Sequence, residues 1–386
     1  MTQSKRLLAL DILRGITIAG MILVNNPGTW GSIYTPLEHA SWHGLTPTDL
    51  VFPFFMFIMG VSSYFSLRKY DFRFTGSSVW KIVKRSLIIL LIGWGVAWLS
   101  LMLRRFNNPD YTVTESLLSF TDIRTLGVLP RLAICYCVSS LIVLAFPHKW
   151  VKWIIGIFLV GYSLVLFLGN GLAFSTDNII AIVDRSLVGE AHMYADTIDG
   201  VTLKFDPEGL LSTIPSIAHC LIGFLCGAMI VKIKNNETHA LNLLIIGAIL
   251  TMAGFLLSYG MPINKKIWSP TFVLTTCGLA SLLLGVLIWV IDIKGHRRWC
   301  QFFEVFGINP LFLYTLSAVL SILFNFIHWP MGEITGSVHN VIYALWLKPM
   351  CGPYTQLASL LYALIFVCIN WAVGLILYKK KIYIKI

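Results

Sequence analysis

Long apolar runs alternate with short polar segments along the whole chain. Each run approaches the ~20 apolar residues that a helix needs to cross a bilayer. The runs lack the alternating ~10-residue segments of a membrane β-barrel. The pattern therefore predicts an all-α, polytopic membrane bundle of about ten transmembrane helices. The predicted spans are residues 7–25, 48–67, 80–102, 127–146, 149–169, 213–232, 239–258, 270–292, 306–328 and 356–378.

The composition indicates that lipid is the main solvent. Of the 386 residues, 57% are hydrophobic and 12% are charged, and the mean hydropathy is +0.77. Soluble domains carry about 25% charged residues, so water-facing side chains are too few here to cover the apolar surface. We see no internal repeat and no separate soluble part, and therefore expect one transmembrane domain over residues 1–386.

The net charge of +11 has two explanations. A basic excess can bind nucleic acid, but multi-pass proteins also gather lysine and arginine in their cytosolic loops. With the N-terminus in the cytosol, 19 of the 29 basic residues fall in cytosolic segments, nine in outer segments, and Arg14 within a span. We therefore expect no nucleic-acid partner, both termini in the cytosol, and an outward-facing segment between the first two spans.

The eight cysteines form no disulfide or metal pattern. Most lie inside apolar runs, where a thiol behaves as a small hydrophobic group, and Cys135-x-Cys137 is not metal spacing. The N-terminal run resembles a signal peptide. However, it is long, contains Asp11 and Arg14, and lacks a small-x-small cleavage site. We expect it to be retained as the first helix.

A polar segment, Glu38–Leu50, leads into the second span. His39 and His43 are four residues apart, which on a helix would be zinc spacing, but Gly44 and Pro47 favour a loop and no third ligand is evident. Imidazole changes charge near neutral pH. One histidine can therefore take a proton from an attacking amine or carry an acyl group itself. By residue type alone, either histidine is also explained as an interfacial hydrogen-bonding residue.

Three neighbours of these histidines have a structural and a functional explanation. Trp42 is typical of the aromatic belt at a membrane interface, and a flat indole also suits a sugar face. Asp49 is favourable in the first turn of a helix, or it orients a histidine. Asn25 ends the first span as an ordinary cap, and its amide can also donate to a developing oxyanion. The sequence leaves these alternatives open.

Charged residues also occur in or beside the spans. Asp11 and Arg14 are three apart and share a helix face, where they form a structural ion pair or contact a cofactor or substrate. Arg131, at the start of the fourth span, holds an anion, pairs with an acid, or extends to the outer interface.

The longest polar stretch, at about residues 170–212, is predicted to be an outer loop. It is either a lid or binding surface or a solvated connector. Near its end, Asp206 and Pro207 predict a helix start, while Asp206 and Glu208 also offer two carboxylates to an amino sugar. Further along, Asn309 precedes Pro310, a pair that marks a broken or kinked helix.

Together these segments resemble the heparan-α-glucosaminide N-acetyltransferase family and its bacterial relatives, which acetylate amino sugars. Two positions depart from the family pattern: Pro130 stands where some members have glutamine, and His43 where several have asparagine. The matching segments are Leu10-Asp11-Ile12-Leu13-Arg14-Gly15, Val24-Asn25, His39 to Gly60 with the family's HxxW motif at His39-Ala40-Ser41-Trp42, Gly127 to Arg131, Asp206-Pro207-Glu208-Gly209, Asn264 to Leu274 with the family's lysine-x-tryptophan-serine at Lys266-Ile267-Trp268-Ser269, and Gly307-Ile308-Asn309-Pro310-Leu311.

The resemblance implies an enzyme that moves an acetyl group from cytosolic acetyl-CoA to the amino group of a glucosamine-type sugar. The acceptor would lie on the outer, periplasmic side of a bacterial inner membrane, and no metal is implied. The implied catalytic residues are His39 and Asn25. The implied substrate contacts are Trp42, Asp49, Asp206, Glu208, Trp268 and Asn309. The implied acetyl-CoA contacts are Asp11, Arg14 and Arg131.

Two other functions remain open at this point. A transporter or channel would also have broken helices and intramembrane charges, although the polar block lies at one mouth rather than at the midplane. An O-acetyltransferase of a cell-surface glycan would use the same chemistry on another acceptor. A homodimer is compatible with all three functions.

Overall fold

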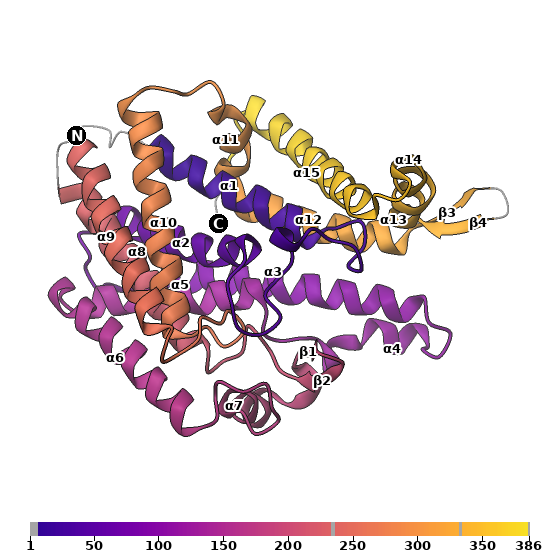
Figure 1. Cartoon of the computed structure of the whole chain (residues 1–386), viewed down its shortest axis with the longest axis horizontal. Helices are drawn as coiled ribbons and strands as arrows, with labels where there is room; N and C mark the ends of the chain where they lie inside the picture. The colour runs from indigo at the N-terminus through magenta and orange to yellow at the C-terminus, as the bar shows by residue number, and fades with distance from the viewer. Residues whose placement is uncertain (1–6, 233–235, 332–333, 385–386) are drawn as a thin grey trace.

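The computed structural model describes residues 7–232, 236–331 and 334–384. Within these residues, nine helices are long and apolar enough to cross a membrane, and a bent helix pair brings the number to ten. The chain is therefore an all-α, polytopic helical bundle of an integral membrane protein, as the hydrophobic pattern predicted (Figure 1).

The long helices follow the predicted spans closely. The largest difference is in the third span, which is four residues longer at each end than the predicted 80–102, because a Thr75–Ser78 capping box starts it earlier. The helices are α1 (Leu8–Asn25), α2 (Val51–Leu67), α3 (Gly76–Phe106), α5 (Val128–Ala145), α6 (His148–Leu168), α8 (Thr213–Lys232), α9 (Asn236–Leu257), α10 (Pro270–Leu287) with its π-helical continuation η6 (Ile288–Ile293), and α15 (Thr355–Lys379).

The predicted break at Asn309-Pro310 is present. α11 (Cys300–Ile308) and α12 (Pro310–Phe326) meet at an angle of 85°. Proline has no backbone N–H to donate and its ring clashes with the preceding turn, so the helix cannot continue straight through Pro310.

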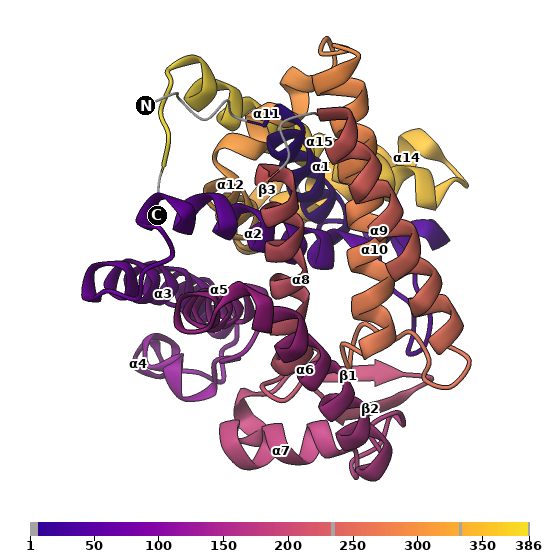
Figure 2. The same ribbon diagram turned by 90° about the vertical axis from the view of Figure 1, so that its left-hand side faces the viewer.

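Glycines allow the central helices to pack with their backbones in contact. A Cβ atom on Gly60 of α2 would lie 2.0 Å from the carbonyl oxygen of Cys220 in α8, and one on Gly223 would lie 2.2 Å from that of Phe57. Close approach of small residues is how helices associate when lipid supplies no hydrophobic driving force between them. Figure 2 shows a second close pair, α9 and α10, side by side.

Short elements cover the loop end of the bundle. In the predicted outer loop, α7 (Ile179–Val188) is followed by an antiparallel hairpin of β1 (Ala195–Ile198) and β2 (Val201–Lys204). Its turn residues Asp199 and Gly200 both have positive φ, as a type I′ hairpin requires. These elements lie at the lower edge of Figure 1. Other short helices between α1 and α8 are η1 (Thr35–Leu37), η2 (Pro47–Leu50), α4 (Val113–Leu117), η4 (Ser119–Asp122) and η5 (Glu190–His192).

A second projection follows α12. It consists of the hairpin β3 (His328–Met331) and β4 (Ile334–Ser337), and its short helices lie at the right-hand side of Figure 1. Those helices, which the hydrophobic pattern did not predict, are α13 (Val338–Asn340), η7 (Val341–Leu347) and α14 (Lys348–Cys351). At the other end, η3 (Arg68–Tyr70) continues α2.

The start of α1 and the tail after α15 lie at the same end of the bundle. A Cβ on Gly307 would lie 2.1 Å from the carbonyl oxygen of Asp11, and Asn309 Nδ2 donates to the carbonyl of Ile382 over 2.9 Å. A chain that crosses the membrane an even number of times has both of its ends on the same side. The assignment of this end to the cytosol remains a prediction, and four of the basic residues behind it lie outside the described residues: Lys5, Arg6, Lys234 and Lys385.

Candidate active site

The connection between α1 and α2 is closed by a capping box. Thr46 N donates to Asp49 Oδ2 over 3.1 Å, and Asp49 N donates to the carbonyl of Thr46 over 3.0 Å. The Thr46 hydroxyl also donates to Asp49 Oδ2 over 3.0 Å. Asp49 is therefore held in the turn η2 that starts the second span, as its sequence position suggested.

The same carboxylate contacts His39. Asp49 Oδ1 lies 2.6 Å from His39 Nδ1, and Asp49 is 1% exposed whereas the His39 side chain is 39% exposed. A carboxylate can only accept, so His39 Nδ1 carries the proton in this bond. The other ring nitrogen, Nε2, is then free to accept a proton. Capping and orienting, the two alternative roles of Asp49, are thus both compatible with the geometry.

Lys265 completes this cluster from the loop between α9 and α10. Its Nζ lies 3.1 Å from His39 Nδ1 and 3.4 Å from Asp49 Oδ1. Burial lowers the pKa of Lys265, and the charges of Asp49 and Glu208 offset only part of this effect. The sequence analysis gave Lys265 no role. Its position beside the matched Trp268 segment, at the mouth of a span, was the available signal.

Two further contacts fasten the Lys265 loop to the histidine segment. Gly44 N donates to the carbonyl of Ile263 over 2.8 Å, and Asn264 Nδ2 lies 3.3 Å from His43 Nδ1. His43 is therefore a contact between two loops, and among the described residues no group of three metal-ligand side chains is placed to hold a metal ion.

Trp42 joins the histidine segment to the outer loop. Its Nε1 donates to the carbonyl of Leu172 over 2.8 Å, and its ring lies 5.1 Å from that of Phe174 and 5.2 Å from that of Phe205. The indole is half-buried in this aromatic cluster. The residue type predicted an anchor or a sugar platform; Trp42 has the contacts of an anchor within the protein, and its substrate contact stays a prediction.

The two carboxylates at the end of the outer loop share one arginine. Arg124 Nε donates to Asp206 Oδ2 over 2.9 Å, and Arg124 Nη2 donates to Asp206 Oδ1 over 2.5 Å and to Glu208. Burial alone would lower the pKa of Arg124, but the adjacent Glu208 and Asp206 carboxylates raise it. The sequence analysis counted Arg124 only as a loop charge, because nothing local links it to residues more than 80 positions away.

Arg131 is fully buried and does not extend to the interface. Its Nη2 donates to the carbonyl of Gly209 over 2.9 Å and to the hydroxyl of Ser212, so it links α5 to the start of α8. Its guanidinium lies over the ring of Trp268, 5.1 Å from the centroid. Two predicted site residues, Arg131 and Trp268, are thereby brought into direct contact.

Asp11 and Arg14 form the predicted ion pair near the other end of α1. Arg14 Nη1 donates to Asp11 Oδ1 over 3.0 Å and to the carbonyl of Gly307 over 3.3 Å, and Nη2 donates to Ser62 Oγ over 2.7 Å. The pair therefore ties α1 to α2 and to the α11–α12 break.

The structure does not bring Asn309 to His39. Asn309 is bonded to the tail after α15, since Nδ2 donates to Ile382 and Oδ1 accepts from Ile384 N over 2.8 Å. Val51, two residues after Asp49, packs on Gly20 of α1, nine residues beyond Asp11, which is about 14 Å along the helix axis. Asn309 thus lies at the Asp11 end of the bundle, bonded to the tail after α15, and its contact with an acceptor stays a prediction.

The two asparagines at the end of α1 differ in environment. Asn26 is buried and its Nδ2 donates to the carbonyl of Ile22 over 2.8 Å, so its amide caps the helix. Asn25 is exposed. The proposed role of Asn25 as oxyanion donor stays a prediction.

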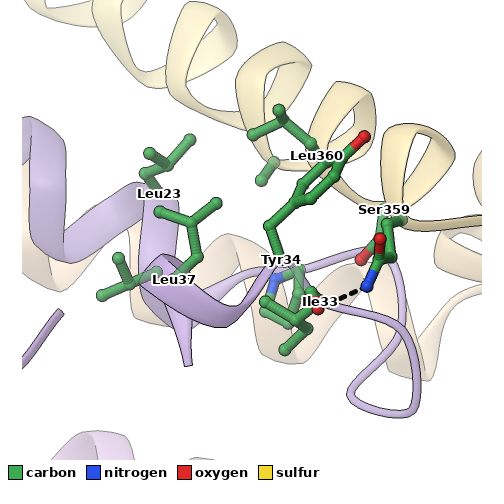
Figure 3. A pocket seen from close by; sticks show the side chains of 10 residues that line it. Leu23, Ile33, Tyr34, Leu37, Ser359 and Leu360 are labelled. Carbon is green, nitrogen blue, oxygen red and sulfur yellow. Dashed lines mark hydrogen bonds between the residues drawn. The ribbon is translucent and has the colours of Figure 1, made fainter. Parts of the chain in front are cut away.

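A small apolar pocket lies beside the same connection. Figure 3 shows Tyr34 and Leu37 of the connection next to Leu360 of α15 and Leu23 of α1, and Gln356 Nε2 donates to the carbonyl of Ile33 over 3.1 Å. The cavity volume is about 10 Å³, close to the minimum for one water molecule. The pocket therefore anchors the connection and has no room for a sugar or a coenzyme.

Comparison with known proteins gives two informative results. No family model matches the chain. The chain is similar to two curated proteins named heparan-alpha-glucosaminide N-acetyltransferase. The Mus musculus protein is 28% identical over 444 residues, which cover 100% of this chain, and the Homo sapiens protein is 28% identical over 442 residues, which cover 99%. The chain spans about 60% of the length of these relatives.

Proposed function

We propose that this chain, a distant member of the heparan-α-glucosaminide N-acetyltransferase family, is an integral-membrane enzyme that acetylates an amino sugar. The donor is cytosolic acetyl-CoA and the acceptor is the amino group of a glucosamine-type sugar on the outer face. The proposed location is the inner membrane of a bacterium, with His39 facing the periplasm. The excess of lysine and arginine in the segments at the opposite end supports this orientation.

The observation that carries the proposal is the bond between His39 and Asp49. A fully buried carboxylate, itself held by three donors, fixes Nδ1 of a partly exposed histidine. This is how a protein selects the imidazole tautomer whose Nε2 can accept a proton.

In the proposed reaction, the sugar nitrogen attacks the carbonyl carbon of the thioester. The C–N bond forms, the C–S bond breaks, and the thiolate leaves with the electron pair of that bond. His39 Nε2 takes the proton that the nitrogen loses, and Asn25 donates to the oxyanion. A route in which His39 first accepts the acetyl group and then passes it to the amine uses the same residues.

The acceptor contacts follow from the charge of the outer cluster. Asp206, Glu208 and Arg124 together carry one net negative charge, which suits an ammonium group and sugar hydroxyls. Trp42 and Trp268 position the loops around this cluster. Asp11, Arg14 and Arg131 remain the proposed donor-side residues.

The test is thiol release from acetyl-CoA by purified protein, with and without glucosamine. We expect release to depend on glucosamine and to be lost in His39→Ala. His43→Ala is the matched control, because it removes an imidazole four residues away without touching Asp49, and it should keep most of the activity. Glucosamine-dependent release by a folded His39→Ala protein at the wild-type rate would remove the mechanism. Release with a glycan hydroxyl acceptor only would favour O-acetylation.

A further inference from the structure

Three buried side chains that can donate hydrogen bonds lie together beside the first turn of α2, the helix that follows Asp49. Phe52, three residues after Asp49 in α2, lies 5.3 Å from the ring of Trp268. The Trp268 ring lies 5.1 Å from the guanidinium of Arg131 and 5.9 Å from the ring of His219 in α8. Arg131 and His219 are 0% exposed and Trp268 is 1% exposed. We call these three residues the donor cluster.

Most hydrogen-bonding capacity of the donor cluster is unused. Within the described part of the chain, Arg131 Nε and Nη1 and Trp268 Nε1 have no hydrogen-bond partner. Three N–H groups of the guanidinium and the N–H of the indole therefore have no acceptor there. His219 adds to this surplus. Even with one of its nitrogens facing the carbonyl of Pro53, its other nitrogen has no partner among the described residues.

A membrane protein does not normally leave such groups without partners. Buried polar groups are almost always paired, and a buried guanidinium without a bonded anion is more costly still. The nearest carboxylates, Asp206 and Glu208, act on Arg131 only at a distance because both are bonded to Arg124. In addition, the backbone of Trp268 has φ of 50°, a left-handed conformation that is strained for a tryptophan. The fold retains this strain where it places the indole in the cluster.

We propose that the donor cluster binds the acyl-carrying arm of the thioester donor, through the amide and thioester carbonyl oxygens of that arm. This deepens the acetyltransferase function proposed above and rests on it. The cluster offers N–H donors and no carboxylate, so it suits a ligand that brings hydrogen-bond acceptors. An amino sugar brings an ammonium group, which fits the Asp206–Glu208 side instead. The cluster also contacts Phe52 in the first turn of α2, the helix that follows Asp49.

The experiment measures donor binding in a His39→Ala background, where no transfer follows. The probes are acetyl-CoA and acetyl-pantetheine, which has the same arm without the nucleotide. Arg131→Met removes the charged donors and should weaken both probes about tenfold to a hundredfold, and Trp268→Phe removes one N–H and should weaken both about threefold to tenfold. Trp268→Phe keeps the ring, so it decides the question if Arg131→Met does not fold.

The matched control is Tyr162→Phe. Tyr162 is also buried, and its hydroxyl already donates to the carbonyl of Ile267 over 2.7 Å, beside Trp268. Its loss should affect thermal stability and leave the affinity for both probes unchanged. A general loosening of this region would instead weaken binding in all three variants equally.

The outcomes separate this inference from the function on which it rests. Unchanged affinity for both probes in Arg131→Met and Trp268→Phe overturns the inference, since the donors would then be satisfied by water. A loss confined to acetyl-CoA also overturns it, because the contact would be to the nucleotide. In either case, glucosamine-dependent thiol release by the wild type keeps the proposed function. Absence of both binding and release in a folded wild type removes both.

Discussion

Replacing Asp49 with asparagine should move the proton of the neutral His39 ring from Nδ1 to Nε2. Three donors surround Oδ2 of Asp49: the backbone nitrogens of Ala40 and Thr46 and the Thr46 hydroxyl. In Asp49→Asn the two backbone N–H groups retain the amide oxygen, since an NH2 group in its place would face both of their hydrogens. The NH2 group must then occupy the Oδ1 position, 2.6 Å from His39 Nδ1 in the wild type. Nδ1 becomes the acceptor, and Nε2 carries the proton.

The expected magnitude follows from this tautomer change. A histidine with Nε2 protonated cannot accept the proton of the amine, and the same change in the serine-protease triad lowers kcat about 10⁴-fold. Here Lys265 remains beside Nδ1 and does not restore the tautomer. We expect kcat to fall about 10³-fold or more, with KM for the sugar changed by less than about threefold because the Arg124 cluster is untouched.

The assay is steady-state acetyl transfer to glucosamine by detergent-purified protein, with thermal unfolding to confirm the fold. Thr46→Val is the matched control. It removes one of the three donors to Oδ2, should lower stability by about 1 kcal/mol, and should keep kcat within a few-fold of the wild type. A folded Asp49→Asn protein with kcat within tenfold of the wild type would refute the orienting role of Asp49.

Two further predictions concern charged residues outside the long helices, Arg124 and Asp184. Arg124→Gln should lower the thermal unfolding temperature, and adding Glu208→Gln should recover part of the loss, whereas additive losses would mean that the two residues do not interact. Burial raises the pKa of Asp184 to about 6, despite hydrogen bonds from the backbone N–H groups of residues 210 and 211. The folded value thus lies above the unfolded one, so Asp184 stabilises the fold at acidic pH and this contribution is lost as pH rises from about 4 through 6. Asp184→Asn should flatten that pH dependence and unfold at a higher temperature than the wild type at pH 8, and a lower temperature there would contradict the assignment.

The sequence by itself determined the features that depend on local composition. Helix spans follow from runs of apolar residues, because a span must satisfy its own backbone hydrogen bonds in lipid. The break before Pro310 follows from the missing N–H of proline. The turn at Asp49 follows from the Thr46-x-x-Asp49 spacing. The pairing of Asp11 with Arg14 also follows from a spacing of three residues on one helix.

Only the tertiary structure decided which of these side chains meet. Lys265 reaches His39 from 226 positions away, and Arg124 reaches Asp206 across 82 positions. Such contacts depend on how whole helices pack, as in the glycine-mediated approach of α2 and α8, and no local spacing encodes them. Asn309 illustrates the limit: its place in a helix break was predictable, but its bond to the tail after α15 exists only because the bundle brings two distant segments to one end.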